Sequence, residues 1–327
     1  MSSESSVLEC RNVTAHYDIG KGIRVRAVDD VELSVKGREI LGLAGESGCG
    51  KTTLMRTIYR DVSPPLRVVS GSVTIRVKDG EEIDIYKLSD AELRRIRAKV
   101  LSYIPQGSMS VMNPTSRVKH QFFEVFRKYG RFKKGEILQQ VKGRLQELGL
   151  RESILESYPH QLSGGMRQRT VIALATIMNP SVVLADEPTS ALDVVYQRGV
   201  VEMIQNIRDM FGTSFIIVSH DMGLHNQITD RIAIMYAGKI IEVGKTDGIF
   251  SDPLHPYTEG LINSIPRIGG SKKLEGLSGL PPNLANPPPG CRFHPRCPYR
   301  MEKCAIEEPP IFRIGDRVVS CWLLEGK

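Results

Sequence analysis

Residues 45–52 constrain the fold of this chain more than any other stretch of its sequence. They read GESGCGKT, which fits the pattern G-x-x-x-x-G-K-[ST] of a loop whose backbone N–H groups wrap the phosphates of a nucleotide. The apolar run 39–44 before the loop predicts a buried strand, and residues 53–59 after it predict a helix. This order of strand, loop and helix is the context that the motif requires. The sequence therefore predicts an α/β fold with a phosphate-binding loop.

The residue types of this loop suit a bound phosphate chain. Glycines let the backbone approach the phosphates closely, and the helix that follows turns its positive end toward them. The Lys51 ammonium is expected to contact the β- and γ-phosphate oxygens, and the Thr52 hydroxyl to ligate Mg²⁺. Cys49 stands at a variable position, where a small buried residue is expected. The predicted nucleotide contacts of the loop are Gly45, Ser47, Gly48, Cys49, Gly50, Lys51, Thr52 and Thr53.

The bulk composition is that of a globular protein with room for one large domain and an appendage. Of the 327 residues, 41% are hydrophobic and 25% charged. No apolar run approaches the ~18 residues of a membrane span, and residues 1–6 show no signal peptide, so the nucleotide site is expected in the cytoplasm. The net charge of +7 is compatible with nucleic acid, a membrane surface or a nucleotide as partner, and favours none of them over a solvated basic surface.

Alternating segments before the loop predict a small antiparallel sheet that flanks the nucleotide. They are residues 7–17, 24–28 and 31–35. Tyr17, at the end of the first segment, suits either a half-buried packing role or stacking on a purine, and the sequence pattern favours packing. Residues 71–77 and 82–85 predict a hairpin around Asp79-Gly80, and Ser89 with Glu92 forms a capping box for a helix over 93–99. The next strand, 100–106, ends in Pro105 and Gln106.

A helical region and a glycine-rich helix start come next. Residues from about 118 to 155 show apolar faces at helical spacing. Ser163 is a good N-cap for a helix that runs to Pro180. Gly164 and Gly165 leave the positive end of this helix bare, which suits an anion.

Two later strands end in polar side chains. The apolar run 182–187 ends in Asp186 and Glu187, whose side chains point to opposite sides of the strand. Asp186 is expected to hold Mg²⁺, directly or through water, and Glu187 to orient and deprotonate a water molecule. Residues 215–220 form a second buried strand that ends in His220. The carboxyl ends of strands in an open α/β sheet are where ligands bind, which links His220 to the other polar residues.

Together these motifs strongly resemble the nucleotide-binding subunit of an ATP-binding-cassette (ABC) transporter, over residues 7–250 or so. The LSGG stretch between a phosphate-binding loop and a paired-carboxylate strand is specific to that family. The matching elements are the P-loop Gly45–Thr52, the Q-loop residue Gln106, the signature Leu162–Met166, the Walker B pair Asp186 and Glu187, the D-loop Ser190–Asp193 and the switch residue His220.

The resemblance implies a RecA-like P-loop NTPase cassette with an N-terminal antiparallel β subdomain and an α-helical subdomain at about 107–170. It implies that Tyr17 stacks on adenine. It also implies that two subunits meet head to tail around two ATP molecules, so that Ser163, Gly164 and Gly165 bind the γ-phosphate of ATP held by the partner. Glu187, His220 and Gln106 would be the catalytic residues, with His220 on the γ-phosphate and Gln106 on Mg²⁺ or the attacking water.

The composition changes after residue 250. Residues 251–258, SDPLHPYT, resemble an element at the end of dipeptide and oligopeptide permease ATPases. The prolines at 281–282 and 287–289 predict an extended linker without regular structure. The expected domains are therefore a nucleotide-binding domain at 1–250 and a small cysteine-rich C-terminal extension at 251–327.

Four cysteines of this extension suggest a metal site. Cys291, Cys297, Cys304 and Cys321 are separated by five, six and sixteen residues, and no C-x-x-C pair is present. Spacing alone leaves Zn²⁺ and a [4Fe–4S] cluster open, and a reducing compartment argues against disulfides. The same arrangement binds [4Fe–4S] in some peptide-permease ATPases, so the resemblance favours the cluster, with His294 as a bystander.

The function implied is that of a peripheral ATPase on the cytoplasmic side of the membrane that energises uptake of peptides. Its partners would be a second ATPase subunit, two transmembrane permease subunits and an extracytoplasmic solute-binding protein, and no nucleic acid. Importers of oligosaccharides or nickel in the same class remain alternatives. A soluble ABC ATPase acting on nucleic acid or ribosomes is disfavoured, because the gap between Lys51 and Ser163 holds no sustained heptads and only one cassette is present.

Overall fold

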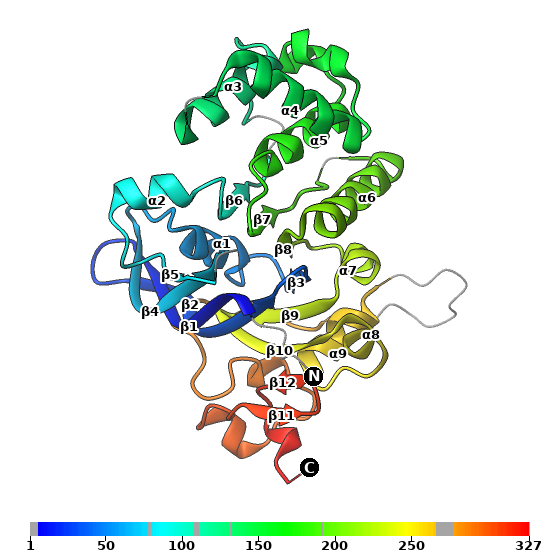
Figure 1. Cartoon of the computed structure of the whole chain (residues 1–327). Coiled ribbons are helices and arrows are strands. Elements are labelled where there is room, and N and C mark those ends of the chain that lie inside the picture. The colour runs from blue at the N-terminus through cyan, green and yellow to red at the C-terminus, as the bar shows by residue number, and fades with distance from the viewer. Residues whose placement is uncertain are drawn as a thin grey trace. The chain divides into compact units, whose positions relative to one another are not determined.

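The structure is a computed structural model, and it describes residues 6–77, 80–107, 111–130, 132–190, 192–265 and 277–326. Some predicted features, namely Asp79 in the hairpin turn, Ala191 in the D-loop and residues 108–110 and 131 of the helical region, lie outside these residues. The chain divides into two compact units (Figure 1). The P-loop unit comprises Glu9–Val35, Ile40–Thr74 and Val218–Lys327, and the helical unit comprises Met1–Leu8, Lys36–Glu39 and Ile75–Ile217.

Five neighbouring strands of a larger sheet form the centre of the P-loop unit. Their order is β11-β12-β10-β9-β3, in which β3 and β9 are parallel and the other neighbouring pairs are antiparallel. All five residues of β3 are buried, as expected for a strand covered on both faces. The bounds are β3 Ile40–Ala44, β9 Arg231–Tyr236, β10 Lys239–Lys245, β11 Phe312–Ile314 and β12 Arg317–Val319.

The last two strands of that sheet come from the C-terminal extension. Figure 1 shows the hairpin of β11 and β12, coloured red, beside β10. Glu242 of β10 is in register with Val319 of β12, and Val243 with Val318. The sequence patterns of the extension predicted a linker and a metal site and did not reveal these strands, since each is only three residues long.

A second sheet carries the order β2-β1-β4 in the P-loop unit. The two segments predicted at 24–28 and 31–35 form one strand, because the backbone continues through Asp30 with a left-handed φ of 55° and the Asp30 N–H donates to Thr14 Oγ1 at 3.1 Å. The bounds are β1 Ser6–Asp18, β2 Arg24–Lys36 and β4 Leu66–Arg76, with the helices α1 Lys51–Tyr59, α7 Met222–Ile228, α8 Thr246–Ser251 and α9 Pro256–Asn263 in the same unit.

The helical unit combines parallel strands with the described part of the predicted helical region. Strands β6 and β7 pair in parallel, with Tyr103 opposite Leu184, and β8 is the next strand in the order. The helical run predicted at 118–155 is interrupted, because Gly130 adopts a fully extended backbone with φ 168° and ψ 177° and ends α3. The bounds are β5 Glu82–Asp84, α2 Asp90–Ile96, β6 Leu101–Ile104, α3 Val118–Tyr129, α4 Lys134–Glu147, α5 Gly164–Thr176, β7 Val182–Asp186, α6 Val194–Phe211 and β8 Ser214–Val218.

Several local predictions are confirmed. Ser89 caps α2 through a reciprocal capping box with Glu92. This helix ends three residues before the predicted position, since Arg97 has an extended ψ of 143°.

Residues 280–290 contain no helix or strand, as their prolines predicted. Short 3-10 helices complete the chain: η2 Glu152–Glu156, η3 Pro159–Gln161, η4 His294–Arg296, η5 Glu302–Ala305 and η6 Trp322–Leu324.

An aromatic core joins the extension to β9 in the P-loop unit. Phe293 is only 1% exposed, and its ring centroid lies 5.3 Å from that of Tyr236 and 5.4 Å from that of Tyr257. Both contacts are edge-on, an arrangement that aromatic rings favour. The extension is therefore anchored through a buried apolar cluster.

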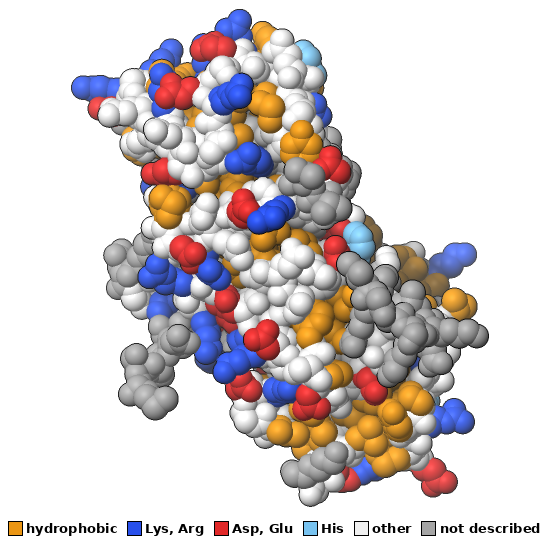
Figure 2. Space-filling view, turned by 90° about the vertical axis from the view of Figure 1, so that its right-hand side faces the viewer, with side chains coloured by type: hydrophobic (Ala, Val, Ile, Leu, Met, Phe, Trp, Pro, Cys, Tyr) orange, Lys and Arg blue, Asp and Glu red, His pale blue; other side chains and the backbone are white. Residues whose placement is uncertain are grey.

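One face of the molecule carries charges of both signs (Figure 2). On the face shown in Figure 2, basic and acidic side chains are interspersed, a pattern typical of a solvated surface. None of the helices that the structure describes is both long and apolar enough to span a bilayer.

Candidate nucleotide-binding site

The loop between β3 and α1 has a backbone that requires glycine. Gly45 has φ 150° and Gly50 has φ 115°, values that side-chain-bearing residues rarely adopt. A Cβ atom at Gly45 would lie 2.2 Å from the carbonyl oxygen of Met235, and one at Gly50 would lie 2.0 Å from that of Ala27. The loop therefore packs against β9 and β2 with no space for side chains at these positions.

The N-terminus of α1 opens directly from this loop. Gly50 is its N-cap, and within the described part of the chain no side chain caps it. The first-turn N–H groups thus form the kind of positive helix end that binds phosphate. Thr52, Ser47 and Gly48 are exposed around it, where a ligand can reach them.

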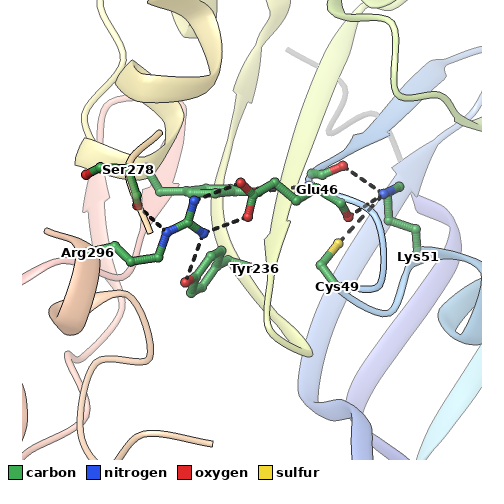
Figure 3. Close-up of polar contacts among 8 residues, drawn as sticks. Glu46, Cys49, Lys51, Tyr236, Ser278 and Arg296 are labelled. Atoms are coloured by element: carbon green, nitrogen blue, oxygen red, sulfur yellow. Dashed lines mark hydrogen bonds and ion pairs between the residues drawn. The ribbon is translucent and has the colours of Figure 1, made fainter. Parts of the chain in front are cut away.

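Lys51 is held against the loop. It is 8% exposed, and its Nζ donates hydrogen bonds to the carbonyl oxygens of Gly45 at 2.7 Å and Glu46 at 2.9 Å (Figure 3). The Cys49 thiol lies 3.8 Å from the same Nζ. Burial raises the pKa of Cys49, and the Lys51 charge opposes that rise. Cys49 is a small buried residue, as its position in the motif predicted.

Tyr17 lies beside the first turn of α1. Its hydroxyl group shares a hydrogen bond with Thr53 Oγ1 at 3.1 Å, and the ring is half-buried. Tyr17 and Thr53 were both predicted to contact the nucleotide. They are 36 positions apart in the sequence, and the structure brings them together.

The paired carboxylates end β7 in the helical unit. Asp186 is 0% exposed, and the Tyr103 hydroxyl group donates to its Oδ2 at 3.4 Å. Glu187 follows in a left-handed conformation with φ 53°, which is uncommon for this residue type and costs of the order of 1–3 kcal/mol. Its carbonyl oxygen accepts the N–H and the hydroxyl group of Ser190 at 3.1 and 3.0 Å, which hold the backbone in that conformation.

Ser163 caps α5 as predicted. The Met166 N–H donates to Ser163 Oγ at 3.3 Å. A Cβ atom at Gly165 would lie 2.5 Å from the ring of Tyr196, so glycine is required for this approach to α6. Gly164 and Ser163 are exposed at the helix start, where an anion can approach.

The other two predicted catalytic residues also follow strands. Gln106 is exposed in the turn after β6, and His220 is exposed after β8. The P-loop unit contains Tyr17, Lys51 and His220, whereas the helical unit contains Gln106, Ser163, Asp186 and Glu187.

Comparison with known proteins identifies the family. Residues 28–190 match a family model described as ABC transporter, and residues 241–304 match one described as oligopeptide/dipeptide transporter, C-terminal region. The chain is 37% identical over 325 residues to the dipeptide transport ATP-binding protein DppD of Caldanaerobacter subterraneus subsp. tengcongensis, with 98% of each chain covered. It is 38% identical over 326 residues to the oligopeptide transport ATP-binding protein AppD of Bacillus subtilis, again with 98% of each covered.

This chain belongs to the ABC transporter family. Solved structures agree with that assignment. The dimeric structure of the bacterial ABC transporter cassette MJ0796 covers 73% of this chain and 98% of its own, at 27% identity and a TM-score of 0.63. A post-hydrolysis structure of the same cassette bound to ADP and Pi is 26% identical at the same TM-score and coverage. The predicted ABC-cassette P-loop NTPase fold is confirmed, and the chain is an ABC ATPase.

Two residues that support the site of this ABC ATPase were not predicted from the sequence. Gln168, 2% exposed on α5, donates from Nε2 to the carbonyl oxygen of Pro188 at 2.6 Å and so ties α5 to the segment after Glu187. Tyr103 reaches Asp186 from the neighbouring strand. The signal in the sequence for Gln168 was an amide among the apolar residues of the predicted helix. Nothing in the sequence indicated that Tyr103 points toward Asp186.

The four cysteines of the extension are free thiols. Burial, with smaller contributions from the charges of Cys304, Cys321 and Cys297, raises the pKa of Cys291 to about 11, so the four groups lie close enough to interact electrostatically. Burial also raises the pKa of Cys297 and of Cys321. Among the described residues, however, no group of three or more His, Cys, Asp or Glu side chains is arranged to hold a metal ion. The predicted iron–sulfur site is therefore not established by the structure.

Proposed function

We propose that this chain hydrolyses ATP to power the uptake of peptides, as one ATP-binding subunit of an ABC importer. The observation that carries the proposal is the match of residues 241–304 to the C-terminal region of oligopeptide and dipeptide transporters. The relatives named for dipeptide and oligopeptide transport also support the proposal, because their similarity covers nearly the whole chain and not the cassette alone.

The phosphates of ATP would be bound by the loop from Gly45 to Thr53. The glycine positions where a Cβ atom would meet backbone oxygens support this role, since the loop is already shaped for close approach of its N–H groups. Lys51 would exchange its carbonyl partners for phosphate oxygens, and Tyr17 would stack on the adenine. The exposed Thr52 hydroxyl, with Asp186 and Gln106, suits Mg²⁺, which prefers oxygen ligands and would neutralise phosphate charge.

Glu187 would act as the general base on the attacking water, assisted by His220 and Gln106. Its left-handed backbone supports this role, because strained conformations of this kind are concentrated at functional sites. Ser163, Gly164 and Gly165 would bind the γ-phosphate of ATP held by a second ATPase subunit. The exposed N-terminus of α5 supports this role, and the related cassette MJ0796 is described as dimeric.

The proposed assembly contains a second, homologous ATPase subunit, two transmembrane permease subunits and an extracytoplasmic solute-binding protein. The chain would lie peripherally on the cytoplasmic side of the membrane. Within it, residues 1–250 would form the nucleotide-binding domain, with a helical subdomain at about 107–170, and residues 251–327 the extension.

We further propose that the four extension cysteines hold a [4Fe–4S] cluster. The four thiols are buried or half-buried, and neighbouring cysteines contribute to the raised pKa of Cys291; a positively charged metal group would stabilise such a donor set as thiolates.

Iron analysis of protein prepared without oxygen tests the cluster. Wild type is expected to contain iron and to show the brown colour of an iron–sulfur protein. Cys297→Ser should lose most of this iron, whereas Cys10→Ser, which changes a buried cysteine of β1, should retain it. A colourless protein that contains zinc and no iron would contradict the proposal.

Glu187→Gln tests the function. This variant should bind MgATP with wild-type affinity, because the side chain keeps its size, and lose hydrolysis because it loses its basic group. The matched control is Glu202→Gln, an exposed carboxylate on α6 that pairs with Arg198. In cells that express the chain with its permease partners, uptake of a labelled dipeptide should stop for Glu187→Gln and continue for the control. Undiminished hydrolysis by Glu187→Gln would refute the assignment of the base.

A further inference from the structure

An acidic residue stands within the phosphate-binding loop. Glu46 is the first variable residue of the motif GESGCGKT, and its side chain is 23% exposed. A carboxylate on a loop that wraps a triphosphate would repel the ligand, and partial withdrawal from water would weaken the screening of that repulsion. The charge of Glu46 therefore needs compensation if the loop is to bind nucleotide tightly.

Arg296 of the C-terminal extension supplies that compensation. Its two terminal nitrogens donate to both oxygens of Glu46, Nη1 to Oε2 at 2.7 Å and Nη2 to Oε1 at 2.9 Å. Such two-pronged pairs are among the strongest hydrogen-bonded ion pairs in proteins. The Arg296 side chain is only 6% exposed, and its Nε donates to the carbonyl oxygen of Ser278 at 2.9 Å. The neighbouring Glu46 carboxylate raises the pKa of Arg296, so the guanidinium stays charged.

The backbone of Glu46 is held as well as its side chain. Its N–H donates to the Tyr257 hydroxyl oxygen at 2.8 Å, and its carbonyl oxygen accepts from Lys51 Nζ at 2.9 Å. Figure 3 shows the carboxylate pointing away from Lys51 and toward Arg296. Two residues beyond position 250, Tyr257 and Arg296, thus hold a loop residue whose carbonyl oxygen also contacts Lys51.

We propose that Arg296 is a positioning residue for nucleotide binding, which neutralises Glu46 and holds its carboxylate away from Lys51 and the phosphates. The inference rests on the proposed binding of ATP to this loop. Without Arg296, the carboxylate is free to pair with Lys51 and to repel the triphosphate. Removing the carboxylate as well removes the cause of the defect, so the double variant separates this role from a purely structural one.

Equilibrium binding of MgATP to the full chain tests the proposal. Arg296→Gln is expected to raise Kd about tenfold at low salt, the factor that corresponds to ~1.4 kcal/mol of uncompensated repulsion. This increase in Kd should be smaller at about 0.5 M salt, where the Debye length is only a few ångströms. The double variant Glu46→Gln with Arg296→Gln should bind within about threefold of wild type, because the repelling charge is gone.

Arg292→Gln is the matched control. Arg292 also ties the extension to the rest of the P-loop unit, through Asp29 and the carbonyl oxygen of Ala237, but it does not contact Glu46. Its loss should raise Kd much less than Arg296→Gln does. A double variant that binds as weakly as Arg296→Gln alone, or an equal loss in Arg292→Gln, would overturn the proposal. Wild-type protein that fails to bind MgATP would instead refute the proposed function of the loop.

Discussion

Acid should destabilise this protein through His255. The residue is the N-cap of α9 and is 1% exposed, and its Nδ1 accepts the N–H of Tyr257 at 3.0 Å. Its ring centroid lies 5.8 Å from that of Phe293. Burial lowers the pKa of His255 to about 3, so the folded protein holds the neutral imidazole. Protonation would bury a charge and remove the acceptor that caps the helix.

The size and sign of the effect follow from linkage. The unfolded chain has an ordinary histidine pKa of about 6.5. Because the folded value is lower, the contribution of His255 is complete above that pH and is lost as the pH falls through 6.5 toward 3. Each unit below 6.5 costs ~1.4 kcal/mol, so the free energy of unfolding should drop by about 2 kcal/mol between pH 8 and pH 5.

A neighbouring carboxylate acts in the opposite direction. Glu242 is 0% exposed and accepts the N–H groups of Leu254 and His255, both at 3.0 Å. Burial raises its pKa, so its contribution increases as the pH falls through the folded value. The wild-type pH dependence is therefore a sum, and a variant is needed to isolate the histidine.

Urea unfolding of wild type and His255→Asn at pH 8 and pH 5 isolates the contribution of His255 to the pH dependence of stability. Asparagine keeps an acceptor at the N-cap but does not titrate in this range. Between pH 8 and pH 5, the free energy of unfolding should fall by about 2 kcal/mol more for wild type than for His255→Asn, whatever the absolute stability of the variant. His160→Asn, at an exposed position, should retain the wild-type pH dependence. Identical pH dependence in wild type and His255→Asn would refute the reasoning.

Two further changes test the packing that supports the site. Phe293→Ala should lower the free energy of unfolding by about 3–5 kcal/mol, because it removes a fully buried ring from the aromatic core; a loss below ~1 kcal/mol in urea would contradict that packing. Gly50→Ala should abolish binding of MgATP, since its Cβ atom would lie 2.0 Å from the carbonyl oxygen of Ala27 in a backbone with φ 115°. Nucleotide titration measures this directly, and wild-type affinity would show that the loop adapts.

Patterns read along the chain predicted the local elements well. The glycine-rich loop, the capping box of Ser89 and Glu92, and the cap at Ser163 each involve residues within a few positions of one another. Their geometry is set by backbone conformation and nearby hydrogen bonds, which the residue types themselves specify. The family resemblance drawn from the same motifs is confirmed by the comparisons.

Contacts between distant segments were decided only by the tertiary structure. Arg296 and Glu46 are separated by 250 positions, and β12 reaches β10 through a register that three-residue strands do not specify by themselves. Such pairs form when packing of a core, here around Phe293, brings their backbones together. A sequence encodes the charge and size of each partner, but which partner each side chain meets depends on how the whole unit packs.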